Sequence, residues 1–150
     1  MNTKILIVAT GLVLLLSGCS DEETHKYTEV TAFNFIQGPE KSVVVSFGEN
    51  PQNHYSFAIK KKYIKTGTEL FSESKNNTNF AVFADINEET LMRAANSPTS
   101  ARVKVISVDT QDQKAVFEVE ATLLNLDAGE LKKLERVEVI FRGDDFLLLI

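Results

Sequence analysis

Cysteine is scarce in this chain of 150 residues, which contains only one, Cys19. A lone cysteine cannot form a disulfide within the chain, and it cannot supply the several thiolates of a structural zinc site. We therefore expect the fold to be held together by its hydrophobic core alone.

Histidine is almost as scarce, and the sequence contains two, His25 and His54. His25 lies in an acidic polar stretch, where we expect it to be solvated. His54 is the only histidine after residue 26, so no second histidine completes a catalytic or metal site beside it. Glycine-rich phosphate loops, calcium-loop spacing and the Gly-x-Ser-x-Gly motif are also missing. We therefore predict a protein that is not an enzyme, with no catalytic residue, no metal and no cofactor.

Positive charge is in deficit. The sequence has 16 lysines and arginines against 21 aspartates and glutamates, for a net charge of −5. Proteins bind nucleic acids largely by neutralising phosphates with lysine and arginine. The deficit therefore argues against a nucleic-acid partner.

Long apolar runs are missing too, except for one from Ile5 to Leu16 that follows the short positive segment Met1 to Lys4. A helix needs about 20 apolar residues to span a membrane, so this run is too short. Its length and flanks are typical of a signal peptide. The alternative interpretation is an uncleaved membrane anchor.

The residues that end this run, Leu16-Ser17-Gly18-Cys19, resemble the lipobox of bacterial lipoproteins. The resemblance implies cleavage between Gly18 and Cys19 and attachment of diacylglycerol to the Cys19 thiol. A durable anchor needs at least two acyl chains, which diacylglycerol supplies. In Gram-negative lipoproteins an aspartate after the cysteine favours the inner membrane. Ser20 at this position implies the outer membrane, facing the periplasm, although a Gram-positive origin stays open.

Three segments follow from this interpretation. Residues 1–18 are a removed signal peptide, residues 19–26 are a polar tether, and residues 27–150 are one β-rich domain. Loss of residues 1–18 removes Lys4, the only charged residue there, so the net charge falls from −5 to −6.

From Tyr27 onward the sequence is rich in β-branched and aromatic residues, and glycine, proline and asparagine interrupt it at intervals. These patterns predict strands at Val30–Ile36, Ser42–Phe47, Tyr55–Ile64, Thr68–Phe71 and Phe80–Ile86. Lysines protect exposed edge strands from pairing with other chains. The lysines at 60–62 therefore predict that the third of these strands lies at an edge.

Two segments have the residues that begin helices. Asn87 precedes two glutamates, and Asp127 precedes Glu130 in the spacing of a capping box. We therefore predict one helix that starts at Asn87 and ends before Pro98, and a second over Ala128–Leu134.

The segment from Ala101 to Leu126 predicts a long hairpin that turns at Thr110–Asp112. A register centred on Gln111 places apolar residues opposite one another on one face and opposite charges on the other. A slip by one residue would bury carboxylates or expose valines. The predicted pairs are Ala101 with Ala121, Val103 with Val119, Val105 with Phe117, Arg102 with Glu120, and Lys104 with Glu118.

A second hairpin is predicted at the end of the sequence. Gly143 and Asp144 suit a two-residue turn. That turn would pair Phe141 with Phe146 and place residues 146–150 in an apolar strand that is covered on both faces.

Together these patterns predict a mainly β fold of about eight antiparallel strands, arranged as a two-sheet sandwich with two short helices. The alternative is an α+β fold in which one curved sheet packs on the helices.

We predict a non-enzymatic envelope lipoprotein that binds another macromolecule, an envelope protein, as an assembly or accessory factor. The alternative is an acidic inhibitor or exclusion factor that acts against a lysozyme-like hydrolase or a phage receptor. Polar loops are suited to such contacts. The contact residues that we predict in two of them are Asn50, Gln52, His54, Lys75, Asn76 and Asn77. The sequence does not indicate an oligomeric state.

Overall fold

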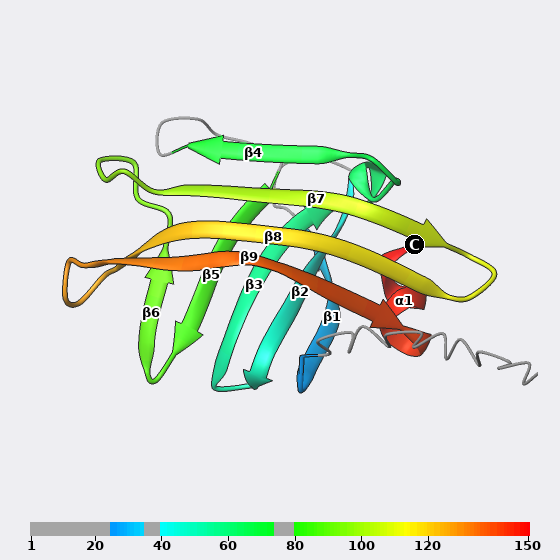
Figure 1. Ribbon diagram of the computed structural model, residues 1–150, viewed down its shortest axis with the longest axis horizontal. Coiled ribbons are helices and arrows are strands. Elements are labelled where there is room, and N and C mark those ends of the chain that lie inside the picture. The colour runs from blue at the N-terminus through cyan, green and yellow to red at the C-terminus, as the bar shows by residue number, and fades with distance from the viewer. Residues whose placement is uncertain (1–24, 35–39, 74–79) are drawn as a thin grey trace, which may run out of the picture.

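A computed structural model describes residues 25–34, 40–73 and 80–150. In this part of the chain the strands are β1 (Tyr27–Asn34), β2 (Lys41–Asn50), β3 (Asn53–Lys60), β4 (Glu69–Glu73), β5 (Phe80–Ile86), β6 (Glu89–Met92), β7 (Ser100–Asp109), β8 (Lys114–Asn125) and β9 (Leu131–Arg142). A 3-10 turn, η1 (Lys61–Tyr63), follows β3, and a helix, α1 (Gly143–Leu149), follows β9 (Figure 1). Gly18, Cys19, Ser20, Lys75, Asn76 and Asn77 lie outside the described residues.

All of these strands belong to one antiparallel sheet, in the order β1-β2-β3-β5-β6-β8-β7-β4, with β9 paired to β8. The mainly β fold is confirmed. Two separate sheets are not observed, because β6 joins β8 through the pairs Leu91 with Asn125 and Met92 with Leu124.

This single sheet folds over on itself into two layers. In Figure 1, β4, β7, β8 and β9 lie in front of β1, β2, β3, β5 and β6 and run across them. We call these sets the front layer and the back layer. Aromatic rings join the layers through the core. The ring of Phe57 on β3 lies 5.4 Å from that of Phe117 on β8, which lies 5.8 Å from that of Phe141 on β9.

The predicted register of the long hairpin is confirmed. All five predicted pairs, from Ala101 with Ala121 to Val105 with Phe117, are partners in β7 and β8. A bulge between Val105 and Ser107 then shifts the register by one residue, so that Asp109 pairs with Lys114.

The predicted helix after Asn87 is wrong, because β5 and β6 form a hairpin there. Asn87 and Glu88 have φ angles of 52° and 66°, and positive φ at both central residues defines the tight turn that suits a two-residue hairpin. Asparagine favours both helix starts and such turns, and the burial of Leu91 on β6 selects the strand.

The predicted helix over Ala128–Leu134 is also wrong, because β9 already begins at Leu131. The turn before it is closed by Asn125, whose Oδ1 accepts hydrogen bonds from the backbone N–H groups of Asp127 and Ala128. Ten residue pairs with β8 outweigh the local capping pattern.

The predicted terminal hairpin is wrong as well, because residues 143–149 form α1. Phe146 and Leu149 of α1 are buried in the core. The carboxylate of Asp145 accepts hydrogen bonds from Thr28 Oγ1 at 2.9 Å and from the backbone N–H of Val30 at 3.2 Å. The second of these bonds satisfies one backbone donor at the free edge of β1, against which the helix packs.

The predicted edge position of the third strand is wrong too, since β3 lies between β2 and β5. Lys60 and Lys62, which end β3 and enter η1, form ion pairs with Glu40 instead. Their ammonium groups hold the pKa of the Glu40 carboxyl below its usual value.

Candidate functional site

A pocket of about 440 Å³ opens between the two layers, at the margin where the β2–β3 and β5–β6 hairpins turn. In Figure 1 both turns lie along the margin of the back layer that extends beyond β9. We call this cavity the end pocket. It is lined by His25, Lys26, Phe47, Gly48, Glu49, Asn53, Tyr55, Ile86, Asn87 and Leu134.

The walls of the end pocket are apolar and come from both layers. Phe47 on β2 and Tyr55 on β3 are cross-strand partners, and their stacked rings lie 5.9 Å apart. Ile86 at the end of β5 and Leu134 on β9 line the pocket with them. Burial raises the pKa of the Tyr55 phenol, so this ring stays uncharged across the physiological range.

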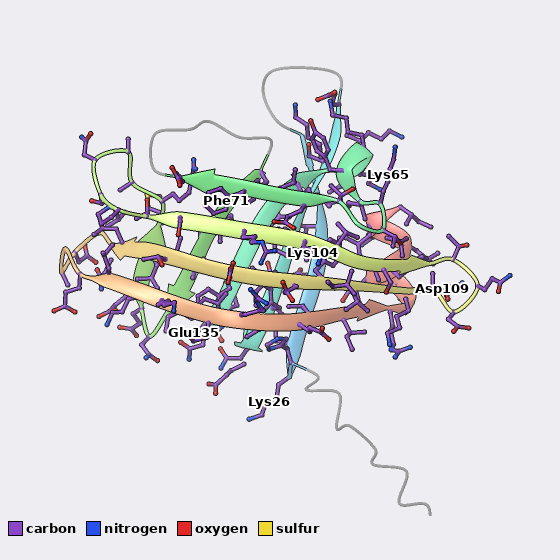
Figure 2. The ribbon with its side chains drawn as sticks, turned by 45° about the horizontal axis from the view of Figure 1, so that its top comes forward. Lys26, Lys65, Phe71, Lys104, Asp109 and Glu135 are labelled. Carbon is purple, nitrogen blue, oxygen red and sulfur yellow. The ribbon has the colours of Figure 1, made fainter. Side chains whose placement is uncertain are left out.

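Polar groups are gathered in residues at the turns and at the start of β1. Asn53 Oδ1 accepts a hydrogen bond of 2.6 Å from the backbone N–H of Asn87, which ties the β2–β3 turn to the β5–β6 turn. The exposed side chains of Lys26 and Glu49 add one charge of each sign. Figure 2 shows Lys26 at this margin of the sheet, directed away from the layers.

His25 is part of the pocket, so the expectation of a solvated side chain is wrong. Its ring centroid lies 5.2 Å from that of Phe47, and the residue is half-buried. The Nε2 atom is buried and has no hydrogen-bond partner among the described residues. A buried polar atom without a partner loses the free energy of its hydration.

The predicted contact residues Asn50, Gln52 and His54 lie beside the pocket and do not line it. Asn50 Oδ1 accepts hydrogen bonds from the backbone N–H groups of Gln52 and Asn53 and thereby shapes the turn. Gln52 is exposed. The alternation of side chains along β3 places His54 on the face opposite Tyr55.

His54 packs on that outer face against Tyr27, with the two rings edge to face at 5.8 Å. Gly48 lies between them in the sheet, paired with Tyr27 on one side and with His54 on the other. A Cβ at Gly48 would come within 2.7 Å of His54 Cα, so only glycine fits there. These contacts are those of a structural residue, although its buried Nδ1, like the Nε2 of His25, has no hydrogen-bond partner among the described residues.

Sequence reasoning missed the apolar walls of the pocket. Phe47, Tyr55, Ile86 and Leu134 have the alternating pattern of core residues, and no local signal separates a pocket wall from a core position. The turn that holds the predicted contact residues Asn50 and Gln52 lies at this margin, and its neighbours Glu49 and Asn53 line the pocket.

The charges predicted for the outward face of the β7–β8 hairpin form a ladder across the front layer. Arg102 on β7 lies 2.8 Å from Glu69 on β4, and 3.3 Å and 3.5 Å from Glu120 and Glu118 on β8. Arg136 on β9 lies 3.6 Å from Glu118. Glu118 and Glu120 are therefore ion-paired on an outer face and do not meet in a cavity.

In residues 25–34, 40–73 and 80–150, no group of three or more histidine, cysteine, aspartate or glutamate side chains is placed to hold a metal ion. No helix formed by these residues has the length and apolarity needed to cross a membrane.

Comparison of the chain with models of protein families, with curated proteins and with solved structures finds no match.

Proposed function

We propose that the protein is a non-enzymatic, lipid-anchored component of the bacterial envelope that binds another envelope macromolecule as an assembly or accessory factor. The end pocket is its binding site. The observation that carries this function is an apolar cavity of about 440 Å³ with polar groups at the surrounding turns. Cavities of roughly 300–1,000 Å³ with a few placed polar groups are typical of ligand sites.

The alternative function, an acidic inhibitor of a cationic hydrolase, is less well supported by the charges on the front layer. That function needs carboxylates whose field is available to a partner. On the front layer, Glu69, Glu118 and Glu120 are already paired with Arg102, and two of them also with Arg136. These pairs weaken the negative field that this face presents.

Affinity capture from a detergent-solubilised envelope tests the proposed function. The full-length protein serves as bait at moderate salt, beside a Leu134→Glu variant that places a carboxylate in the pocket wall. The matched control is Leu147→Glu, the same change at a side chain of α1 that is 52% exposed. We expect the wild type and Leu147→Glu to retain the same envelope component and Leu134→Glu to lose it, because an ionised group disfavours an apolar ligand.

Equal retention by all three baits would exclude the end pocket as the binding site. A basic hydrolase that is retained at low salt and released as the salt rises would support the inhibitor instead.

A further inference from the structure

We infer that the end pocket binds an acyl chain of a membrane phospholipid. This inference rests on the proposed function, since it relies on the anchor at Cys19 and on the end pocket as the binding site. It makes a membrane phospholipid, and not the side chain of a protein partner, the group that enters the pocket. Three observations lead to it: the volume of the pocket, its lining and the short connection to Cys19.

The volume favours a chain over a single side chain of a protein partner. A pocket of about 440 Å³ has room for roughly fifteen groups the size of a water molecule. A methylene group is of similar size, whereas even tryptophan has fewer non-hydrogen atoms in its side chain. A folded-back or partly inserted acyl chain fills this space with groups that match the walls.

The lining combines apolar side chains with polar ones, as a phospholipid combines apolar chains with a polar head group. Phe47, Tyr55, Ile86 and Leu134 offer contacts to methylene groups. The ammonium group of Lys26 suits a lipid phosphate, and the carboxylate of Glu49 suits the cationic amine of a zwitterionic head group.

The connection to the membrane sets the direction from which a ligand arrives. His25 follows Cys19 by six residues, and a fully extended segment of that length spans at most about 20 Å. If Cys19 carries the anchor, the opening of the pocket stays within that distance of the lipid surface. The apolar groups that the bilayer presents there are acyl chains.

A tryptophan reporter tests this inference, because the natural chain contains no tryptophan. Full-length Tyr55→Trp protein is reconstituted into phospholipid vesicles whose acyl chains carry bromine, a contact quencher, near the methyl end. In a bilayer these bromines lie far below the surface, so they reach residue 55 only if a chain enters the pocket. The matched control is Phe71→Trp, at a position on β4 that is 54% exposed.

We expect Tyr55→Trp to lose most of its emission in brominated vesicles, relative to unbrominated ones, and Phe71→Trp to lose none. Adding Leu134→Glu to the reporter should restore the emission. Circular dichroism shows whether each variant folds, and Ile86→Trp replaces the reporter if Tyr55→Trp does not.

Unquenched emission from a folded reporter would overturn the inference. If Leu134→Glu still abolishes capture of an envelope protein, the proposed function stands and the pocket accepts a protein side chain instead. If capture is also insensitive to Leu134→Glu, the end pocket is neither a lipid site nor the site that binds the envelope component. Quenching by an added brominated fatty acid, without quenching by brominated phospholipid, would show that the pocket binds free fatty acids and not phospholipid chains. That result would also overturn the inference.

Discussion

The two layers of this sheet have an opening at each of two places, and only one of these openings is filled by side chains. Beside β1 the opening is filled by α1, which buries Phe146 and Leu149 and binds the edge of β1 through Asp145. Lys61 on η1 adds a hydrogen bond of 2.7 Å to the carbonyl oxygen of Ile150. At the β2–β3 and β5–β6 turns, the opening is left as the end pocket.

Under the proposed function, the filled opening contributes to stability and the open one to binding. Where apolar side chains fill the opening, their burial stabilises the fold. Where Phe47, Tyr55, Ile86 and Leu134 line a cavity, part of their surface stays available to a ligand. Substitutions at the filled opening should therefore change the free energy of unfolding, and substitutions at the open one should mainly change binding.

The largest effect is expected at Phe146, whose side chain is 1% exposed. Phe146→Ala should lower the free energy of unfolding by about 3–5 kcal/mol, since it removes buried apolar contacts and leaves a cavity. Urea denaturation followed by circular dichroism measures the change. Leu147→Ala on the exposed side of the same helix should stay within about 0.5 kcal/mol of the wild type. Equal losses for the two variants would show that α1 does not fill this opening.

A smaller effect is expected at Asp145. Asp145→Ala should cost about 1–3 kcal/mol, because the hydroxyl of Thr28 and the backbone N–H of Val30 lose their shared acceptor. Asp145→Asn keeps one acceptor oxygen and should cost less in the same denaturation experiment. Hydrogen exchange at the amide of Val30 should accelerate in the alanine variant, and an unchanged exchange rate would contradict the contact.

At the open end, Leu134→Ala should cost only about 1 kcal/mol, the centre of the range for single substitutions, because this side chain is half-buried. The same variant should bind ligand more weakly, since the smaller side chain offers fewer apolar contacts in the pocket. A loss of stability as large as that of Phe146→Ala would make Leu134 a core residue and would remove the contrast between the two openings.

The smallest effect is expected in the ladder of the front layer. The hydrogen bond from Arg102 holds the pKa of Glu69 below its ordinary value of 4.5. The Glu69 carboxylate therefore adds stability above its unfolded pKa, and this contribution is lost as the pH falls through the lower, folded pKa. Glu69→Gln should reduce the fall in stability with acid, measured by thermal unfolding at a series of pH values below 5. Because the pair is exposed, about 1 M salt should remove most of the difference between variant and wild type.

The register of β7 and β8 was predictable because two independent patterns agree on it. Valines alternate with charges in both halves of the hairpin, so only one register aligns Val103 with Val119 and also Arg102 with Glu120. The bulge after Val105 was not predictable, because it depends on how the hairpin packs against the rest of the sheet.

The ends of elements were less predictable, since one local pattern serves two structures. Asn87 suits a helix start and a hairpin turn equally, and residues 146–150 are apolar enough for a strand or a buried helix. Asp145 selects the helix through contacts with Thr28 and Val30, more than a hundred residues earlier in the sequence. The end pocket brings together the start of β1, two hairpins and β9, so its walls could not be found before the fold was known.

The most direct test of the contrast between the two openings is a methyl-labelled NMR spectrum of the full-length protein in lipid nanodiscs. Nuclear Overhauser effects between protein methyl groups and acyl methylenes report contacts of a few ångströms. We predict such contacts for Ile86 and Leu134 in the end pocket, and none for Leu147 and Leu148 on the exposed side of α1. Contacts at α1 without contacts at the end pocket would contradict the assignment of the open end as the binding site.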